Sequence, residues 1–447
     1  MAYTLTVAQA AKRLGVTVQA VYKRIRQGAL DAIQVNGRWM LNDEEGSILV
    51  PAVPGRPRKG AAYVLMNGPY RVMEFNYREA TGDFKTFEVF DAARAPLGTV
   101  TRNGRGNASG LQDWWQHRVI PESRAGLDAK LAQLGLESPE QIPFRNLGLS
   151  LSDQYWICPA GSKLDWHDIN YFENSFGPVA GKDGGGQPWD AWLSQVGLDS
   201  PDNTSEGVLP KRWVCDGDKR LLFKGTNPWI DQQPFNEVVA TVLYRRILNP
   251  DEYVPYELVR DSRGDVVACS CPCFVGSDEE FIPAARVIET QGKRAGEPIY
   301  DALVRHARLL GVAKGEVELF ISKMIVCDSI LANGDRHTRN FGFIRDIDSL
   351  KLRMAPLFDS GNSLWFDKDE SAAAQRDWSF IARPFDAVPN RQLYLAGSME
   401  WLDPEALAGF ADEAATILEE SIFALPRLSY IRDGIQSRID AVLSMRG

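Results

Sequence analysis

Residues 330–346, ILANGDRHTRNFGFIRD, place a short charged turn between two apolar runs. An aspartate, two arginines, a histidine and an asparagine fall within the six positions 335–340. A solvated turn needs polar residues, but it does not need this many different functional groups in so short a span. Burial of the apolar residues on both sides would hold the two ends of the turn in the core. The segment is therefore predicted to be a fixed loop that carries a site.

The spacing inside this turn indicates phosphoryl transfer. Asp335 and Asn340 stand five residues apart, as do the catalytic aspartate and the metal-binding asparagine of protein kinases in D-x-x-x-x-N. We expect an apolar strand to end at Asp359, so that Asp359-Ser360-Gly361 takes the place of the kinase Asp-Phe-Gly. Magnesium prefers oxygen ligands, and Asn340 and Asp359 would supply a carboxamide and a carboxylate. His337 and Arg339 are further candidates on the nucleotide side, although His337 is also suited to packing within the loop.

Further kinase parts precede the turn in the expected order. KRLLFKGT predicts a strand that ends at Lys224, a candidate ligand of the α- and β-phosphates. FNEVVATVLYRRIL predicts a helix, on which Glu237 could pair with Lys224. DVVACSCPCFVG predicts a strand leading to a hinge, where the carbonyl of Pro272 and the amide of Phe274 could bind adenine.

The phosphate loop is the weakest of these assignments. NTSEGVLPKRW stands where a glycine-rich loop should be, but it holds a single glycine. Its candidate nucleotide-binding residues are Ser205, Gly207 and Lys211.

Composition limits the class of protein. A chain of 447 residues is long enough for several domains, and it holds no apolar run long enough to span a bilayer. The N-terminus lacks the layout of a signal peptide, and six cysteines do not make a disulfide scaffold, so we expect a cytoplasmic protein without a membrane partner. Residues 1–60 hold nine Lys/Arg against four Asp/Glu, which leaves about −14 on the rest of a chain whose net charge is −9. The basic N-terminal segment is thus the part expected to meet nucleic acid.

That segment predicts a winged helix-turn-helix. TVAQAAKRLGV and TVQAVYKRIRQG read as two capped amphipathic helices, and AIQVNGRWML reads as a hairpin about Asn-Gly. The pattern resembles the excisionase and MerR-type DNA-binding domain, which implies binding of double-stranded DNA through residues 1–48. A helical hairpin with a solvated basic face is the alternative. The candidate DNA-binding residues are Gln19, Lys23, Arg24, Arg26 and Arg38.

The remaining boundaries follow from composition and from the kinase parts. Residues 49–60 are a basic Pro/Gly linker, and 61–200 form an N-terminal accessory subdomain of strands and helices. Residues 201–275 form the kinase small lobe with the phosphate loop and hinge, and 276–447 form a helical large lobe with the catalytic loop.

The segments TSEGVLPKRW, LLFKG, NGDRHTRNFGF and APLFDSGNSLW together resemble the HipA-like serine/threonine kinase family. The resemblance implies an α+β, bilobal, protein-kinase-like fold that uses ATP and Mg²⁺, with Asp335 as the catalytic acid/base and Asn340 and Asp359 on the metal. It also implies a protein substrate, for which an aminoacyl-tRNA synthetase is one candidate, and a toxin–antitoxin role with a DNA-binding antitoxin partner. Autophosphorylation would fall on Ser205 or the neighbouring Thr204. The fused N-terminal domain departs from the common plan and puts the need for a separate antitoxin in doubt.

Two other functions remain open from the sequence. The chain could be a DNA-binding transcription regulator whose kinase-like body senses nucleotide with weak catalysis. It could also phosphorylate a lipid or a small molecule, because the same constellation serves such acceptors.

Overall fold

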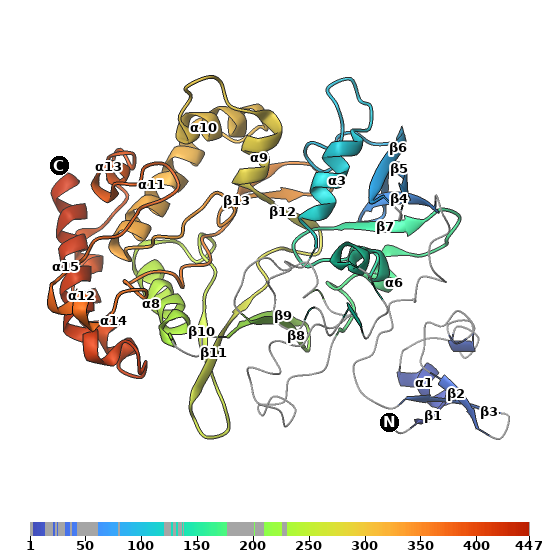
Figure 1. Ribbon diagram of the computed structural model, residues 1–447, viewed down its shortest axis with the longest axis horizontal. Coiled ribbons are helices and arrows are strands. Elements are labelled where there is room, and N and C mark those ends of the chain that lie inside the picture. Colours follow the sequence, from blue (N-terminus) through green and yellow to red (C-terminus); the bar gives the residue numbers. More distant parts are fainter. Residues whose placement is uncertain are drawn as a thin grey trace. The chain divides into compact units, whose positions relative to one another are not determined.

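The structure is a computed structural model, and Figure 1 labels its helices and strands. It describes residues 3–13, 21–22, 25, 32–35, 38–42, 61–78, 81–119, 127, 131–132, 136, 138–176, 201, 210–225 and 230–446. The chain divides into two compact units, of which the first contains residues 1–208, 212–221 and 276–278. The second contains residues 209–211, 222–275 and 279–447. Each unit is described by itself.

The first unit begins with the first helix and the hairpin of the predicted winged helix-turn-helix, whose predicted second helix lies mostly outside the described residues. Strand β1 (Tyr3–Thr6) leads into helix α1 (Val7–Arg13), and β2 (Ala32–Val35) and β3 (Arg38–Asn42) form a sheet with β1 in the order β1-β3-β2. Val35 pairs with Arg38, which confirms the two-residue hairpin. Apolar side chains of this segment form one buried cluster: Val7, Ala10, Ala11, Val21, Ile25 and Leu41.

A reciprocal capping box starts helix α1, as the sequence predicts. The Gln9 side chain accepts hydrogen bonds from the backbone N–H of Thr6 at 2.9 Å and from its hydroxyl at 2.8 Å. The backbone N–H of Gln9 donates to Oγ1 of Thr6 at 3.3 Å. These bonds satisfy amides that the first helical turn leaves without intrahelical partners.

The rest of the first unit is a sheet that packs on short helices. Its strands β4 (Ala61–Asn67), β5 (Tyr70–Arg78), β6 (Asp83–Val89) and β7 (Tyr155–Pro159) stand in the order β6-β5-β4-β7. Helices α3 (Ala108–Gln116), α5 (Ile142–Arg145) and α6 (Trp166–Ile169) and most of strand β8 (Lys211–Asp216) also belong to this unit. Phe144 lies 4.5 Å from Trp115 and 4.2 Å from Tyr77 between ring centroids, at the centre of an aromatic core.

The second unit starts with the parts predicted for the kinase small lobe. Strands β9 (Lys219–Lys224), β11 (Val266–Pro272) and β10 (Glu257–Arg260) are neighbours in one sheet, and the end of β9 belongs to this unit. Helix α8 (Gln232–Ile247) packs on β10 and β11. Most of its side chains are buried, so the helix is held by the surrounding protein on several sides.

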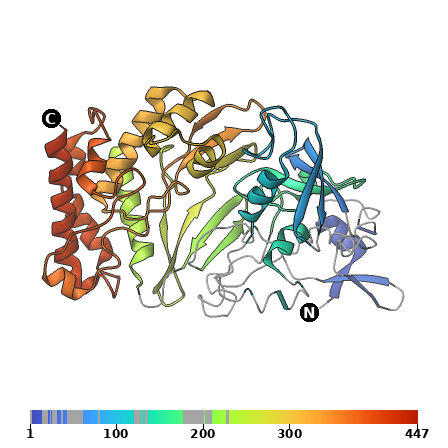
Figure 2. The same cartoon turned by 45° about the horizontal axis from the view of Figure 1, so that its top comes forward.

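Helices dominate the remainder of this unit. They are α9 (Ala284–Gln291), α10 (Ile299–Leu309), α11 (Lys314–Ile330), α12 (Glu370–Ala374), α13 (Pro389–Tyr394), α14 (Phe410–Leu418) and α15 (Leu428–Met445). Helix α14 packs against α8 and α15, and α11 packs against α15 (Figures 1 and 2). None of the helices in the described ranges is long and apolar enough to cross a membrane.

A small sheet positions the charged turn of residues 333–340. Strands β12 (Glu279–Pro283), β13 (Gly342–Asp346) and β14 (Leu352–Met354) are antiparallel neighbours in that order. The turn therefore joins the end of α11 to the start of β13. Gly342 allows a close approach there, because a Cβ at this position would lie 2.2 Å from the carbonyl oxygen of Ile282.

Candidate kinase site

Lys224, at the end of β9, lies at the centre of the candidate site. Its ammonium group donates to Oε1 of Glu237 at 2.9 Å and to Oδ1 of Asp359 at 2.6 Å. It also donates to the hydroxyl of Tyr256 at 3.1 Å. The predicted ion pair of Lys224 and Glu237 is thus present. Asp359, predicted as a metal ligand, forms a second ion pair with the same lysine.

Mutual attraction favours the charged forms of Lys224 and Asp359. Burial alone would lower the pKa of Lys224, but Asp359 and Glu237 outweigh burial and raise that pKa well above its ordinary value. Burial would raise the pKa of Asp359, but Lys224 and then Lys211 outweigh it and hold the pKa below its usual range. Burial raises the pKa of Glu237, although Lys224 opposes this. The cluster therefore depends on the lysine charge to hold two carboxylates close together.

Tyr256 is a member of this cluster that the sequence analysis missed. Its hydroxyl accepts from Lys224 and, at 3.4 Å, from the backbone N–H of Asp359. Burial raises its pKa well above the ordinary value, so the hydroxyl remains protonated. Its backbone N–H donates at 2.9 Å to Thr241, which anchors it to helix α8. No sequence signal singled it out, because a tyrosine at the start of a strand is ordinary.

Asp359 lies in a strained backbone conformation rather than at a strand end. The predicted strand is shorter than expected, because β14 ends at Met354 and Asp359 follows five residues later. Asp359 has a φ of 60°, in the left-handed region that few residues other than glycine adopt. The next backbone amide, that of Ser360, donates to Oε2 of Glu237 at 2.8 Å. This bond fixes the Asp359-Ser360-Gly361 turn on helix α8.

The candidate acid Asp335 is connected to the same turn. Asn362 donates from its side-chain amide to Oδ2 of Asp335 at 2.8 Å, and Arg383 approaches Oδ1 at 3.5 Å. Asn362 is in turn held by Gln233 of α8 at 2.8 Å. The Asp335 side chain remains 36% exposed. The carboxylate is therefore oriented by neighbours but still accessible.

A buried ion pair fixes the backbone of the turn. Arg336 and Asp328 are both almost fully buried, with Nε of the arginine 2.9 Å from the carboxylate. Arg336 also donates to the carbonyl of Asn340 at 3.0 Å, to the carbonyl of Phe358 and to Oγ of Ser360 at 3.0 Å. Burial would lower the pKa of Arg336, but Asp328 outweighs it and raises the pKa. One side chain thus joins the 335–340 turn to the Asp359 segment.

The sequence contains a signal for the ion pair of Arg336 with Asp328, which the sequence analysis did not predict. Arg336 belongs to the crowded turn, and Asp328 lies in the most apolar part of α11, where a charge must be paired.

The side-chain amide of Asn340 is held within the turn. Its amide nitrogen donates to the carbonyl of Asp335 at 3.1 Å, and its side-chain oxygen accepts no bond within the described part of the chain. A hard cation needs such an oxygen together with a carboxylate. The donor set of Asn340 and Asp359 fits magnesium, and the lysine ammonium on Asp359 indicates that this carboxylate already attracts positive charge.

The other predicted residues have different surroundings. Phe274 follows the end of β11 and stacks on Phe358 at 5.0 Å, which joins the proposed hinge to the residue before Asp359. His337 donates its backbone N–H to the carbonyl of Asp335 at 2.7 Å and so helps to close the turn. Arg339 lies 3.7 Å from Glu289.

Several predicted residues lie outside the described residues: Thr204, Ser205, Gly207, Gln19, Lys23, Arg24 and Arg26. Pro272 ends β11, Lys211 begins β8, and Arg38 begins β3.

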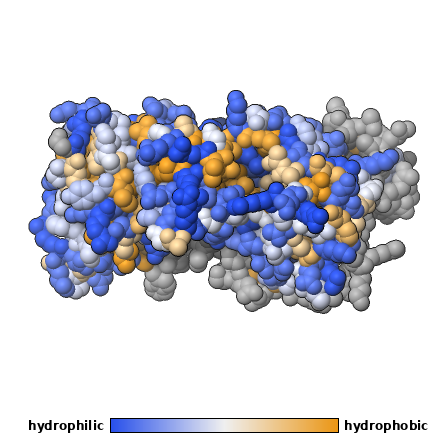
Figure 3. Space-filling model, turned by 90° about the horizontal axis from the view of Figure 1, so that it is seen from above, coloured by the Kyte–Doolittle hydropathy of each residue, from blue (hydrophilic) through white to orange (hydrophobic). Residues whose placement is uncertain are grey.

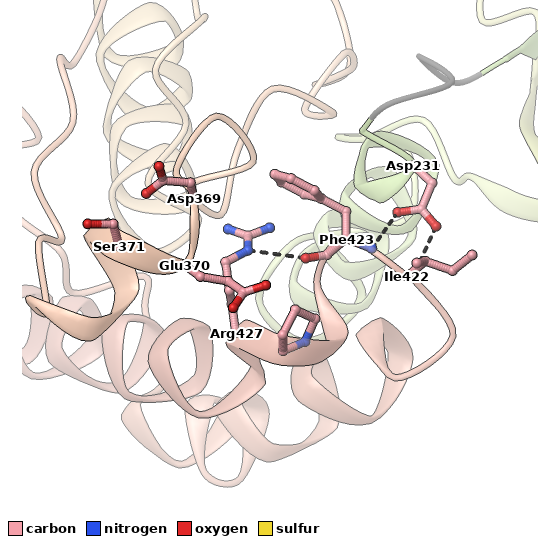
Figure 4. A pocket seen from close by; sticks show the side chains of 8 residues that line it. Asp231, Asp369, Glu370, Ser371, Ile422, Phe423 and Arg427 are labelled. Carbon is pink, nitrogen blue, oxygen red and sulfur yellow. Dashed lines mark hydrogen bonds between the residues drawn. The ribbon is translucent and has the colours of Figure 1, made fainter.

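A separate cavity of about 470 Å³ lies among the C-terminal helices (Figure 4). It is lined by Asp231, Asp369, Glu370, Ser371, Ile422, Phe423, Pro426 and Arg427. Asp231 accepts from the backbone amides of Ile422 at 2.8 Å and Phe423 at 3.0 Å, and Arg427 donates to the carbonyl of Phe423 at 3.2 Å. These polar groups therefore stabilise the turn before α15, and no residue of the lysine cluster lines the cavity.

Comparison with known proteins supports both parts of this description. Residues 4–45 match the family described as a helix-turn-helix domain. The chain is similar to one chain in the structure of the HipA, HipB and operator DNA complex of the toxin–antitoxin system of Shewanella oneidensis MR-1, with a TM-score of 0.53 and 13% identity. That similarity covers 86% of this chain and 97% of the other.

Two further similarities are to one kinase of Helicobacter pylori. The crystal structure of its proinflammatory kinase CtkA gives a TM-score of 0.41 with 15% identity, over 53% of this chain and 94% of that one. The sequence of the serine/threonine-protein kinase CtkA of strain J99 / ATCC 700824 is 39% identical over 54 residues. The matched region spans 12% of this chain and 17% of that relative. The chain thus carries a helix-turn-helix domain at its N-terminus and has the α+β, kinase-like fold of HipA, as the sequence predicts.

Proposed function

We propose that the chain is an ATP- and magnesium-dependent serine/threonine kinase of the HipA-like type. The observation that carries the proposal is that the ammonium group of Lys224 donates hydrogen bonds to the carboxylates of both Glu237 and Asp359. In addition, Asn362, which follows the Asp359-Ser360-Gly361 turn, donates a hydrogen bond to Asp335. A buried lysine between two carboxylates and an accessible acid beside them are the parts that phosphoryl transfer requires.

Each residue has a role in this proposal. Bound Mg·ATP supplies the phosphoryl group, and the metal offsets the charge that develops on it. Asn340 and Asp359 would hold the metal, and Lys224 would turn from Asp359 toward the phosphates while Glu237 keeps it in place. Asp335 would accept the proton of the attacking hydroxyl, oriented by its bond to Asn362. Lys211, Ser205 and Gly207 would contact the phosphates, and Pro272 and Phe274 would contact adenine.

The kinase is also proposed to act on its own phosphate loop. A phosphate on Ser205 or Thr204 would add roughly −1.5 to −2 charge. That charge would compete with the nucleotide for Lys224 and so lower activity. A phosphopeptide map of protein incubated with Mg·ATP should show modification within residues 203–211, absent in Asp335→Asn, and an unmodified loop in the active protein would contradict this regulation.

The N-terminal domain is proposed to bind double-stranded DNA. This binding would either target the kinase to DNA or serve in its autoregulation. The match of residues 4–45 to helix-turn-helix domains supports this. The structural relative was solved in a toxin–antitoxin complex with operator DNA, so a separate antitoxin remains an option here. An aminoacyl-tRNA synthetase stays a candidate phosphoryl acceptor on the family resemblance alone.

One experiment separates the proposal from the two alternatives. The purified chain is incubated with γ-labelled ATP and magnesium, alone, with a cell lysate and with extracted lipids. Magnesium-dependent label in protein supports a protein kinase. Nucleotide binding without transfer would point to a sensor, and label in lipid or in small molecules would point to another acceptor.

A further inference from the structure

One fixed segment lies directly beside the candidate acid. Residues 381–388, IARPFDAV, bring the guanidinium of Arg383 to 3.5 Å from Oδ1 of Asp335. The carbonyl oxygen of Ile381 lies 3.4 Å from where a Cβ on Gly334 would be, so the segment contacts the residue before Asp335. A molecule that delivers a hydroxyl to Asp335 therefore meets this segment.

Buried groups hold the 381–388 segment in place. Gln392 of α13 is buried, and its side chain donates to the carbonyl of Arg383 at 2.6 Å and accepts from the amides of Phe385 at 3.0 Å and Asp386 at 3.3 Å. The backbone amide of Ala382 donates to the carbonyl of Ala387 at 3.1 Å. The ring of Phe385 also packs edge-on against Tyr300 at 5.5 Å between ring centroids. The segment is thus a platform with a defined shape.

Two side chains project from this platform without being needed to hold it. Ile381 is 63% exposed, and the Arg383 side chain is 52% exposed. A single exposed isoleucine is ordinary, but here it stands two residues from a cation at the candidate acid. An exposed ion pair at 3.5 Å, such as that of Arg383 with Asp335, contributes little to stability. The guanidinium can therefore exchange this contact for another carboxylate at little cost.

We propose that the 381–388 segment docks an extended peptide segment of the protein substrate. The acceptor serine or threonine would lie at Asp335, an apolar side chain of the substrate would pack on Ile381, and an acidic side chain would pair with Arg383. The inference rests on the proposed kinase function and names the class of its substrate. Charge complementarity and the fixed position beside Asp335 favour a peptide of this composition.

An oriented library of synthetic peptides tests the proposal. Each peptide holds one serine, with leucine, aspartate, lysine or alanine fixed at one flanking position, and the full chain is incubated with the library and labelled Mg·ATP. The readout is the ratio of transfer rates between peptides within one variant, so that general activity cancels. Wild type should prefer one position with leucine and another with aspartate.

Substitutions assign each preference to its residue. Ile381→Ser should reduce the leucine preference by about tenfold. Arg383→Glu should convert the aspartate preference into a lysine preference. Ile422→Ser and Arg263→Ala change similarly exposed side chains elsewhere in the same unit and should leave both ratios unchanged. Thermal unfolding of each variant checks that the fold is retained, and Ile381→Val provides a milder change.

The outcomes separate the inference from the kinase assignment. Transfer without flanking preference, or preferences that persist in both variants, would overturn the docking role while the kinase function stands. Transfer to lysate protein but to no peptide would also overturn docking of an extended segment. No transfer to any peptide or protein would instead contradict the proposed kinase.

Discussion

Lys224 and Asp359 form a 2.6 Å ion pair although 135 residues separate them in the chain. The pair joins the end of β9 to the strained turn that follows β14, and Glu237 supports it from α8. Lys224 is therefore the residue that forms an ion pair with both carboxylates. The stability of this region should consequently depend on Lys224, and in a pH-dependent way.

Lys224→Met should destabilise the protein more at high pH than at low pH. Without the lysine charge, buried Glu237, whose pKa burial already raises, must bind a proton to remain buried. When the pKa of a carboxyl is higher in the folded state than in the unfolded state, the free energy of unfolding of the protein falls as pH rises between the two pKa values. We expect the loss in free energy of unfolding to grow between about pH 5 and about pH 8 and to reach roughly 3 kcal/mol.

Urea unfolding at several pH values measures this dependence. The double variant Lys224→Met/Glu237→Gln removes the titrating carboxyl, so its stability should depend less on pH than that of Lys224→Met. A loss that stays constant with pH in the single variant would contradict the proposed charge balance.

Tyr256→Phe tests whether the hydroxyl positions the lysine. The change removes an acceptor for Lys224 and for the amide of Asp359 but keeps the buried ring. A typical hydrogen bond to a charged group contributes about 1.5–3 kcal/mol, so phosphoryl transfer should fall by about tenfold or more. Initial rates at saturating and limiting ATP show whether affinity or turnover changes. Tyr394→Phe alters an exposed tyrosine and serves as the control, and equal rates in both variants would rule out the role.

Asp231→Ala should destabilise the C-terminal helices without altering the site. Asp231 caps the turn before α15 through two backbone amides and the hydroxyl of Ser421 at 2.7 Å. Losing such a cap costs about 1–2 kcal/mol. Chemical denaturation should show this loss, whereas nucleotide affinity measured under native conditions should be unchanged. A variant as stable as wild type would contradict the capping role.

Arg24→Glu should weaken binding of the full chain to mixed-sequence duplex DNA. The reversal places a negative charge on the helix predicted to contact the phosphates, and the remaining affinity should fall less steeply with salt. Arg13→Glu makes the same charge change on helix α1 and should cost less. Fluorescence anisotropy across a salt series measures both variants. Equal losses would mean that binding follows net charge rather than the recognition helix.

The sequence predicted the elements that depend on local patterns. The capping box of Thr6 and Gln9 and the turn between Val35 and Arg38 follow from residue types at fixed offsets, and the structure confirms them. The contact of Lys224 with Glu237 followed from their order along the chain. Local sequence patterns were thus sufficient to predict those features that need particular residue types at a fixed spacing or in a fixed order.

The contacts that join distant segments could not be predicted from the sequence. Asn362 reaches Asp335, and Arg336 reaches Ser360, only because the fold brings two turns together. The left-handed conformation of Asp359 has no local signal, since the sequence pattern favoured a continuous strand. Tertiary packing decided these positions, and side-chain identity alone does not encode them.

The most direct test of the proposed function is phosphoryl transfer by Asp335→Asn. The amide keeps the shape of the side chain but cannot accept the proton of the attacking hydroxyl. Asp348→Asn, a change at an exposed carboxylate in the turn before β14, is the matched control. We predict that transfer of label from Mg·ATP falls by a factor on the order of 100 or more in Asp335→Asn, while ATP affinity stays within about twofold of wild type. Undiminished transfer by Asp335→Asn would contradict the proposal that Asp335 is the catalytic base.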